Sequence, residues 1–139
     1  MQFRKTETGY YLRLHKGEEL VTAVTGFAEE AGIGSGFITG IGALCDVELG
    51  CFEVETREYI RKVFAGDYEL INLTGNISKV DGEPFLHAHV TLGDDKFGVF
   101  AGHLFKGTIA VTGEFLVSAS SLEISRKHDE ETGLKLLDL

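Results

Sequence analysis

The sequence predicts an α+β fold: a compact single domain over residues 1–139, with a strongly curved or barrel-like, mostly antiparallel sheet and a packed helix. The order of the elements supports this, because one helical pattern lies near the N-terminus and many strand-like segments follow it. The 18 glycines are about 13% of the chain against an average near 7%, and they suit bends and bulges in a curved sheet. No linker, repeat or low-complexity tract divides the chain.

The first elements predicted are a strand at residues 10–14 and a helix at about residues 18–31. Apolar residues at helical spacing form one stripe on this helix, and we expect Phe27 within it to be buried. Glu18 and Glu19 are expected in the first turn, where negative charge complements the helix dipole. Gly32 is placed to end the helix in a left-handed conformation.

Strand patterns fill most of the remaining chain. Residues 36–44 are predicted to form a buried strand, and further strands are expected at 47–54, 59–64, 68–78, 85–92, 97–105, 108–118 and 122–126. Asp81-Gly82 and Gly93-Asp94-Asp95 carry turn signals between strands. The segment Thr39-Gly40-Ile41-Gly42 lacks a full G-x-G-x-x-G pattern opening a helix, so its glycines indicate close packing and not nucleotide binding.

Composition restricts the partners. Thirteen basic against 22 acidic side chains give a net charge of −9, which disfavours nucleic-acid backbones and anionic membranes. No apolar run approaches the roughly 20 residues needed to cross a bilayer, and the N-terminus lacks the apolar core of a secretory signal. Cys45 and Cys51 match no known zinc spacing and are expected to be reduced in a cytoplasmic protein, although their pairing stays open.

Three histidines give the best indication of function. His87 and His89 alternate with apolar residues, so on a strand both side chains project from one face. His103 lies in the next apolar stretch, and an antiparallel neighbour could carry it to the same place. Three imidazoles leave a coordination position for water or substrate, so we predict a divalent metal site, with zinc the first choice. The alternative is that these histidines line a strand for solubility, hydrogen bonding or interface packing.

Other polar residues give weaker signals. Glu114 lies on a later strand and is the candidate catalytic residue, as a metal ligand, an orienting group or a general base. An exposed or ion-paired strand carboxylate is the simpler interpretation of Glu114. Glu69 and Asn76 are candidate polar anchors, or partners of backbone groups. His15 and His128 are expected to be ordinary surface residues.

Taken in order, several short segments make the whole chain resemble the plants-and-prokaryotes conserved (PPC) domain family. The matching segments cover nearly the full length: Gly17-Glu18-Glu19-Leu20, Phe37-Ile38-Thr39-Gly40-Ile41-Gly42-Ala43-Leu44, Tyr68-Glu69-Leu70-Ile71-Asn72-Leu73-Thr74-Gly75-Asn76-Ile77, Pro84-Phe85-Leu86-His87-Ala88-His89 and Gly102-His103-Leu104. The resemblance implies a barrel-like α+β protomer, a homotrimer, and metal binding at His87, His89 and His103 as in prokaryotic members. Plant members carry AT-hook segments that contact DNA, and this chain has no such hook.

The histidine arrangement is also similar to that of zinc-dependent acetolactate decarboxylases, which are related to the family in fold. Fold analogy alone does not transfer their reaction. Three functions therefore stay open: a metal-dependent enzyme acting on a small metabolite, a trimeric DNA-associated or protein-interaction module with a structural metal or none, and a small-ligand sensor without turnover. A metal site favours the first and third, whereas net charge −9 weakens direct DNA binding.

Overall fold

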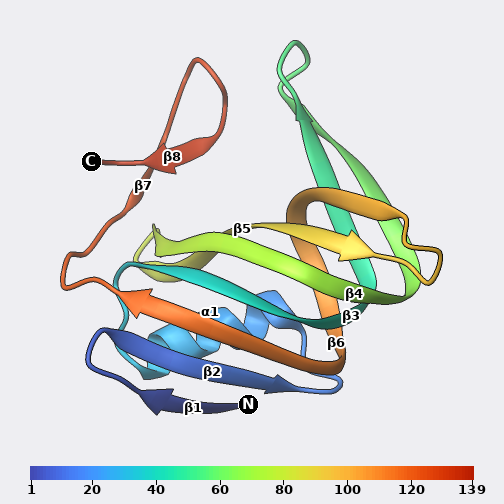
Figure 1. The fold of residues 1–139 in the computed structure, drawn as a ribbon. Helices are drawn as coiled ribbons and strands as arrows, with labels where there is room; N and C mark the ends of the chain where they lie inside the picture. The colour runs from blue at the N-terminus through green and yellow to red at the C-terminus, as the bar shows by residue number, and fades with distance from the viewer.

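Strand-forming sequence dominates this chain, and the computed structural model, which describes residues 1–139, shows eight strands and one helix (Figure 1). The elements are β1 (Gln2–Lys5), β2 (Gly9–His15), α1 (Leu20–Glu30), β3 (Gly36–Glu53), β4 (Glu58–Val80), β5 (Glu83–Gly93), β6 (Val99–Ala119), β7 (Arg126–His128) and β8 (Lys135–Leu137). The single helix, α1, is too short to cross a membrane.

Three of the strands are longer than the sequence predicts, because predicted neighbours join. Segments 36–44 and 47–54 form β3, segments 59–64 and 68–78 form β4, and segments 97–105 and 108–118 form β6. The polar and glycine residues between them bend the strands without ending them. Asp46, for example, has φ +50° at a register shift between Cys45 and Val47, and Gly66 has φ +95°. These bends supply the curvature that the glycine content predicts.

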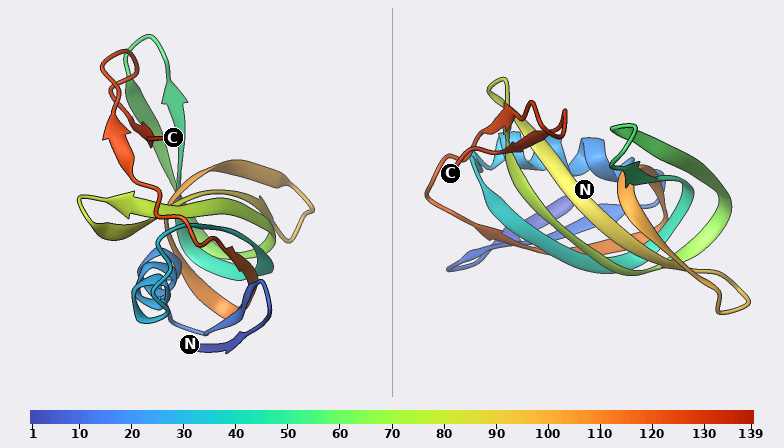
Figure 2. Two further views of the ribbon diagram at one scale, coloured as in Figure 1. Left: turned by 90° about the vertical axis from the view of Figure 1, so that its left-hand side faces the viewer. Right: turned by 90° about the horizontal axis from the view of Figure 1, so that it is seen from above.

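The six main strands form one sheet in the order β1-β2-β6-β3-β4-β5, with every pair antiparallel. The sheet curls because β6 bends, so that residues near its start pair with β5 while its later residues lie between β2 and β3 (Figure 2). β1 pairs only with β2 and leaves a free edge. Of the two alternatives that the sequence predicts, the structure therefore shows the strongly curved sheet and not a complete barrel.

The helix begins later than predicted. Glu19 is the N-cap residue, and its carboxylate accepts hydrogen bonds from the backbone N–H groups of Val21 and Thr22 at 3.1 and 2.8 Å. Glu18 lies before the cap and accepts from the N-terminal ammonium group. Neither carboxylate is in the first turn, but Glu19 still satisfies the exposed N–H groups there. Gly32 has φ +65°, so the left-handed end of the helix is confirmed.

Helix α1 packs against β5 and β6, the two strands that carry the predicted histidine site. Its stripe of Leu20, Val24 and Phe27 is fully buried in the one apolar core, which confirms the prediction for Phe27. The Phe27 ring meets the rings of Phe3 and Tyr10 edge-to-face at 5.0 and 5.3 Å between centroids. This packing fixes the scaffold beneath the site.

Two end segments differ from the prediction. β1 was not expected, because its alternation is short and largely polar, as is typical of an edge strand. The predicted strand at 122–126 is wrong: most of this segment is irregular, and strand structure begins at Arg126 in β7, which pairs with β8. Both turn predictions are confirmed. Asp81 and Gly82 have φ +54° and +89°, and the Asp94 side chain accepts from the N–H groups of Lys96 and Gly98.

Candidate metal centre

Strand β5 positions the first two histidines. Alternation places Leu86, Ala88 and Val90 in the core, while His87 is half-buried and His89 is exposed on the opposite face. The apolar side of the strand is held by packing, so the imidazole side is fixed in register with it. Both rings therefore belong to one surface, as the sequence predicts.

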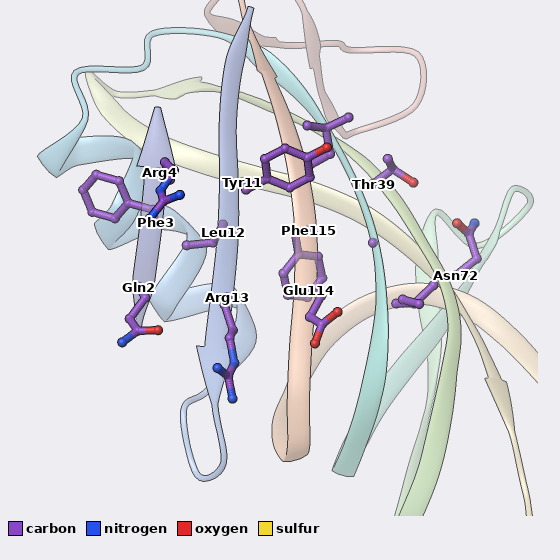
Figure 3. A pocket seen from close by; sticks show the side chains of 13 residues that line it. Gln2, Phe3, Arg4, Tyr11, Leu12, Arg13, Thr39, Asn72, Glu114 and Phe115 are labelled. Carbon is purple, nitrogen blue, oxygen red and sulfur yellow. The ribbon is translucent and has the colours of Figure 1, made fainter. Parts of the chain in front are cut away.

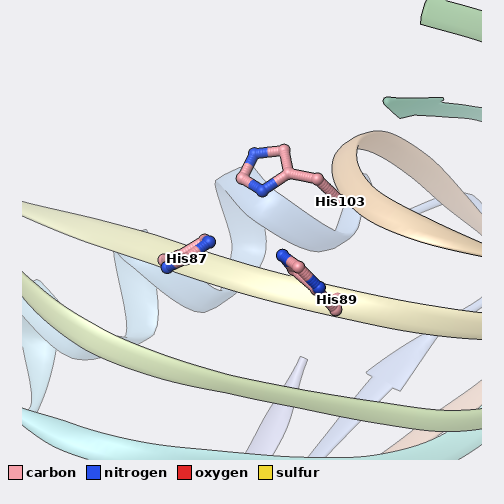
Figure 4. Close-up of side chains that lie close together, drawn as sticks. All are labelled: His87, His89 and His103. Carbon is pink, nitrogen blue, oxygen red and sulfur yellow. The ribbon is translucent and has the colours of Figure 1, made fainter. Parts of the chain in front are cut away.

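The third histidine comes from the neighbouring strand. His103 on β6 is the direct partner of His89 in the antiparallel pairing of β5 and β6. The three ring centroids are 5.0 to 5.5 Å apart, and one ligand atom from each ring lies within 4.8 Å of the other two. Figure 4 shows the His103 ring held over His87 and His89, with a ring nitrogen turned toward them. The structure thus brings together all three predicted ligands within one protomer.

An aromatic wall supports His103. The ring of Phe105 lies 4.7 Å from that of His103, and the ring of Tyr59 lies 5.1 Å away. Arg61 stacks on the outer side of Phe105 at 3.7 Å and contacts the Glu48 carboxylate at 3.3 Å. Tyr59 comes from β4, so the wall joins a distant part of the chain to the histidines. This packing restricts the His103 rotamer and shields one side of the site from water.

The site favours the neutral forms of His87 and His103. Burial, followed by the positive charge of nearby histidines and arginines, lowers the pKa of His103 to about 4. Burial also lowers the pKa of His87, and the charge on Arg126 adds to that effect. Neutral rings keep the lone pair that a metal ion needs. At neutral pH, His87 and His103 are therefore ready to act as ligands.

The residues present fit a transition-metal ion. The Nδ1 atom of His103 is buried and has no hydrogen-bond partner, although buried nitrogens are normally satisfied. Imidazole is a preferred ligand of zinc, whose Zn–N bonds of about 2.0–2.1 Å place tetrahedral donors roughly 3.3 Å apart. The present spacing of up to 4.8 Å is wider, so small side-chain rotations would close the three nitrogens around an ion. A bound ion would satisfy the orphaned nitrogen.

The sequence and the fold of this chain match those of known proteins. The model of the Plants and Prokaryotes Conserved domain matches residues 1–121. The chain belongs to this family. A PPC protein from Pyrococcus horikoshii is 40% identical, covers 99% of this chain and 96% of its own, and has a TM-score of 0.86. A metal-containing protein from Archaeoglobus fulgidus is 37% identical over 98% of both chains, also with a TM-score of 0.86.

A candidate DNA-binding protein from Bacteroides thetaiotaomicron is 36% identical over 99% of this chain and 96% of its own, with a TM-score of 0.94. No curated protein matches the chain. The matched part of the PPC domain ends at residue 121, so it includes the histidines and leaves out the β7–β8 hairpin.

In this PPC domain Glu114 lies outside the histidine cluster. Glu114 lies further along β6, opposite Arg13 of β2 and Ile41 of β3. Its side chain lines a separate groove on the open face of the sheet (Figure 3), and none of the three histidines lines that groove. Within one protomer the structure therefore does not bring Glu114 to the histidines, and a catalytic role for Glu114 stays a prediction. The simpler interpretation, a strand carboxylate on the surface, describes its position.

The remaining candidates lie as follows. Asn76 is a polar anchor, because its side-chain oxygen accepts from Arg126 at 2.8 Å beside His87. Glu69 and Cys45 line another groove, and both Cys45 and Cys51 are free thiols. The exposed His128 lies 3.8 Å from the Glu130 carboxylate and is not a member of the histidine cluster.

Close packing explains the glycines at 40 and 42. A Cβ atom at Gly40 would collide with the Phe115 ring, and one at Gly42 would collide with the Thr112 carbonyl.

The sequence did not predict that Tyr59 and Arg126 lie at the site. Both residues come from distant segments of the chain, and no local pattern indicates their position.

Proposed function

We propose that this PPC domain protein binds a divalent metal ion, zinc first, through His87, His89 and His103, and offers the remaining coordination position to a small oxygen-bearing ligand. The observation that carries the proposal is the convergence of three imidazoles around the unsatisfied Nδ1 of His103. The metal-containing relative from Archaeoglobus fulgidus supports it, at 37% identity over nearly the whole chain. His89 is exposed, so a ligand has access to the site.

Binding is favoured over turnover. A metal at this site would supply Lewis acidity to a carbonyl or carboxylate oxygen, or lower the pKa of a bound water. General acid–base catalysis would also need a carboxylate or similar group at the site. No Asp or Glu side chain joins the histidine cluster. We therefore propose a ligand-binding or sensing role; an enzyme activity would depend on a proton carrier such as Tyr59 beside His103, the substrate or another protomer.

We propose further that the protein is a cytoplasmic homotrimer. Large apolar side chains are exposed along the open face of the sheet, including Tyr11, Phe37, Ile41 and Val111, each with more than half of its surface accessible. Such a patch marks an interaction surface in most soluble proteins. Self-association would cover it, and would also protect the free edge of β1.

DNA binding is the second candidate, because the Bacteroides relative is described as a candidate DNA-binding protein. The net charge of −9 opposes it, since phosphate contacts supply most non-specific affinity. The cations nearest the site do not form a free basic stripe: Arg61 contacts Glu48, and Arg126 is engaged in hydrogen bonds. Titration with duplex DNA at stated salt tests this alternative, and we expect no binding at 0.15 M salt.

Elemental analysis of the purified protein tests the main proposal. We expect about one zinc equivalent per protomer after loading and desalting, and a loss of that zinc in His103→Ala. His128→Ala is the matched control, because it removes an exposed histidine outside the cluster and should leave the zinc content unchanged. Equal zinc content in both variants would contradict the assignment.

A further inference from the structure

Arg126 reaches the histidine cluster from the C-terminal hairpin, outside the matched part of the PPC domain. Its Nε atom donates to Ser78 Oγ at 2.9 Å, Nη1 donates to the Lys135 carbonyl at 2.8 Å, and Nη2 donates to Asn76 Oδ1 at 2.8 Å. Nη2 also lies 3.3 Å from Nδ1 of His87. Four contacts thus hold the guanidinium beside the predicted metal ligands.

None of these partners is a carboxylate. Arg126 makes no salt bridge, whereas Arg61, the other arginine near the site, contacts Glu48 at 3.3 Å. Arg126 is half-buried, so its positive charge is only partly compensated by water. A full charge without a counter-charge at a predicted ligand site indicates that the counter-charge arrives with the ligand.

The hydrogen bond from Arg126 to His87 and the coordination of a metal ion by His87 cannot exist at the same time. A guanidinium can only donate, so Nδ1 of His87 must be the acceptor and Nε2 must carry the ring proton. A neutral imidazole has one free lone pair. If a metal binds Nδ1, it takes the lone pair that Arg126 uses; if it binds Nε2, the proton moves to Nδ1, which can no longer accept. In either case metal binding releases one N–H of Arg126.

We propose that this released N–H makes Arg126 the anion-recognition residue of the site, selecting a small organic carboxylate as the ligand that completes the metal coordination. The inference rests on the proposed metal binding. Three neutral imidazoles leave the charge of a divalent ion uncompensated, and Arg126 adds one more positive charge. A carboxylate can place one oxygen on the metal and the other on the N–H of Arg126.

The surroundings favour an organic carboxylate over inorganic phosphate. Arg126 is the one arginine at the cluster without a salt bridge to a carboxylate. No helix N-terminus adds backbone N–H donors there, because α1 begins at Leu20 beside the chain end. A dianionic phosphate usually recruits several such donors. Aromatic rings flank the site instead, with Tyr59 beside His103 and Phe85 at 5.3 Å from the guanidinium of Arg126. They offer an apolar surface to the carbon skeleton of the ligand.

Cobalt-loaded protein provides the test, because the visible spectrum of Co²⁺ changes when an exogenous ligand binds. We expect acetate to change the spectrum at constant ionic strength, and acetamide, its neutral isostere, to bind at least about tenfold more weakly. Arg126→Gln should lose about tenfold or more in acetate affinity, the effect expected for one charge-assisted hydrogen bond. The same variant should bind zinc more tightly, since a competing donor and a repelling charge are removed.

Lys127→Gln is the matched control, because it makes the same charge change at the next residue, which is exposed. It should keep the acetate affinity of the wild type. Equal acetate affinity in wild type and Arg126→Gln would overturn the proposal while leaving metal binding intact. Failure of the wild type to bind Co²⁺ or Zn²⁺ would instead overturn the proposed function, and this inference with it.

A measurement on the metal-free wild type needs no variant to fold. Long-range ¹H–¹⁵N NMR identifies the tautomer of each histidine, and we expect the proton of His87 on Nε2 before zinc is added. When zinc binds His87, the hydrogen bond from Arg126 Nη2 to His87 Nδ1 should be lost. A metal-free His87 with its proton on Nδ1 would show that Arg126 does not donate to it, and would refute the mechanism.

Discussion

Two polar surfaces of this sheet differ in what they can do. The histidine cluster (His87, His89 and His103) gathers three identical donors behind an aromatic wall, with one nitrogen left unsatisfied. The open-face groove, which Glu114 lines, is a mixed surface where Glu114 lies opposite Arg13 in register and exposed apolar side chains such as Ile41 stand nearby.

The comparison shows what distinguishes a ligand site from an interaction surface. Convergence of like donors with an unmet hydrogen-bonding need indicates a missing ligand. A mixed surface, in which exposed apolar side chains lie among charged and polar ones, is typical of protein–protein contact. The sequence predicts the three histidines as metal ligands and Glu114 as a weaker catalytic candidate, and the fold shows that only the histidines converge.

The largest expected difference between the two surfaces is in the stabilisation that zinc gives to the folded protein. Zinc at a thousandfold excess over its dissociation constant should stabilise the wild type by about 4 kcal/mol, because it binds only the folded state. The double variant His87→Ala/His89→Ala should lose this stabilisation entirely, while Glu114→Ala should keep it. Thermal unfolding with zinc and with a chelator measures both. If Glu114→Ala also lost the stabilisation by zinc, the groove could no longer be separated from the metal site.

Assembly should depend on the groove and not on the cluster. Ile41→Asp combined with Leu116→Asp puts two charges among the exposed apolar side chains of the groove, and we expect the proposed trimer to dissociate to monomers. Each monomer should still bind zinc, because one protomer supplies all three histidines. Sedimentation equilibrium and zinc content check these outcomes together. Val54→Asp, at an exposed position outside the groove, is the control.

The core beneath the cluster gives the third test. Phe27→Ala should destabilise the protein by about 3–5 kcal/mol, the usual effect of removing a fully buried phenylalanine. Phe97→Ala, at a residue 93% exposed, should change stability by no more than about 0.5 kcal/mol. Urea denaturation of both variants measures the difference. Similar losses in the two would show that α1 does not stabilise the strands that carry the histidines.

Much of this fold follows from the sequence because its signals are local. Alternation fixes which face of β5 carries His87 and His89, and antiparallel pairing of the next strand brings His103 opposite His89. The helix also follows from its spacing, although the capping role of Glu19 moves its start. These features depend on neighbours a few residues apart, or on one strand pairing.

The features that the sequence did not predict depend on distant contacts. Asp46 and Gly66 look like turn residues, yet the long pairing of β3 with β4 continues past them as bends. Arg126 stands in a charged run that resembles a solvated surface segment. Its hydrogen bonds to Asn76 and Ser78 bring it to the cluster from about 50 residues away, and no local pattern predicts such a contact.

Acidification should give the smallest effect, and it concerns the cluster alone. Because burial lowers the pKa of His103 to about 4, the folded ring stays neutral where the unfolded ring, with an ordinary pKa near 6.5, is protonated. The unfolded state therefore binds more protons between these values. By linkage, the metal-free protein should lose stability as pH falls from about 6.5 toward 4, by at most about 1.4 kcal/mol per pH unit for this group.

Urea denaturation of chelator-treated protein between pH 7.5 and 5 measures this loss. His103→Gln removes the titrating ring and should flatten the decline in stability, whereas His128→Ala, which removes an exposed ring outside the cluster, should leave its slope as in the wild type. Zinc should steepen the decline, because protons then compete with the ion for the same lone pairs. An identical slope in His103→Gln and wild type would mean that His103 is not held neutral by burial, and the cluster would then resemble the open surface to which it is compared.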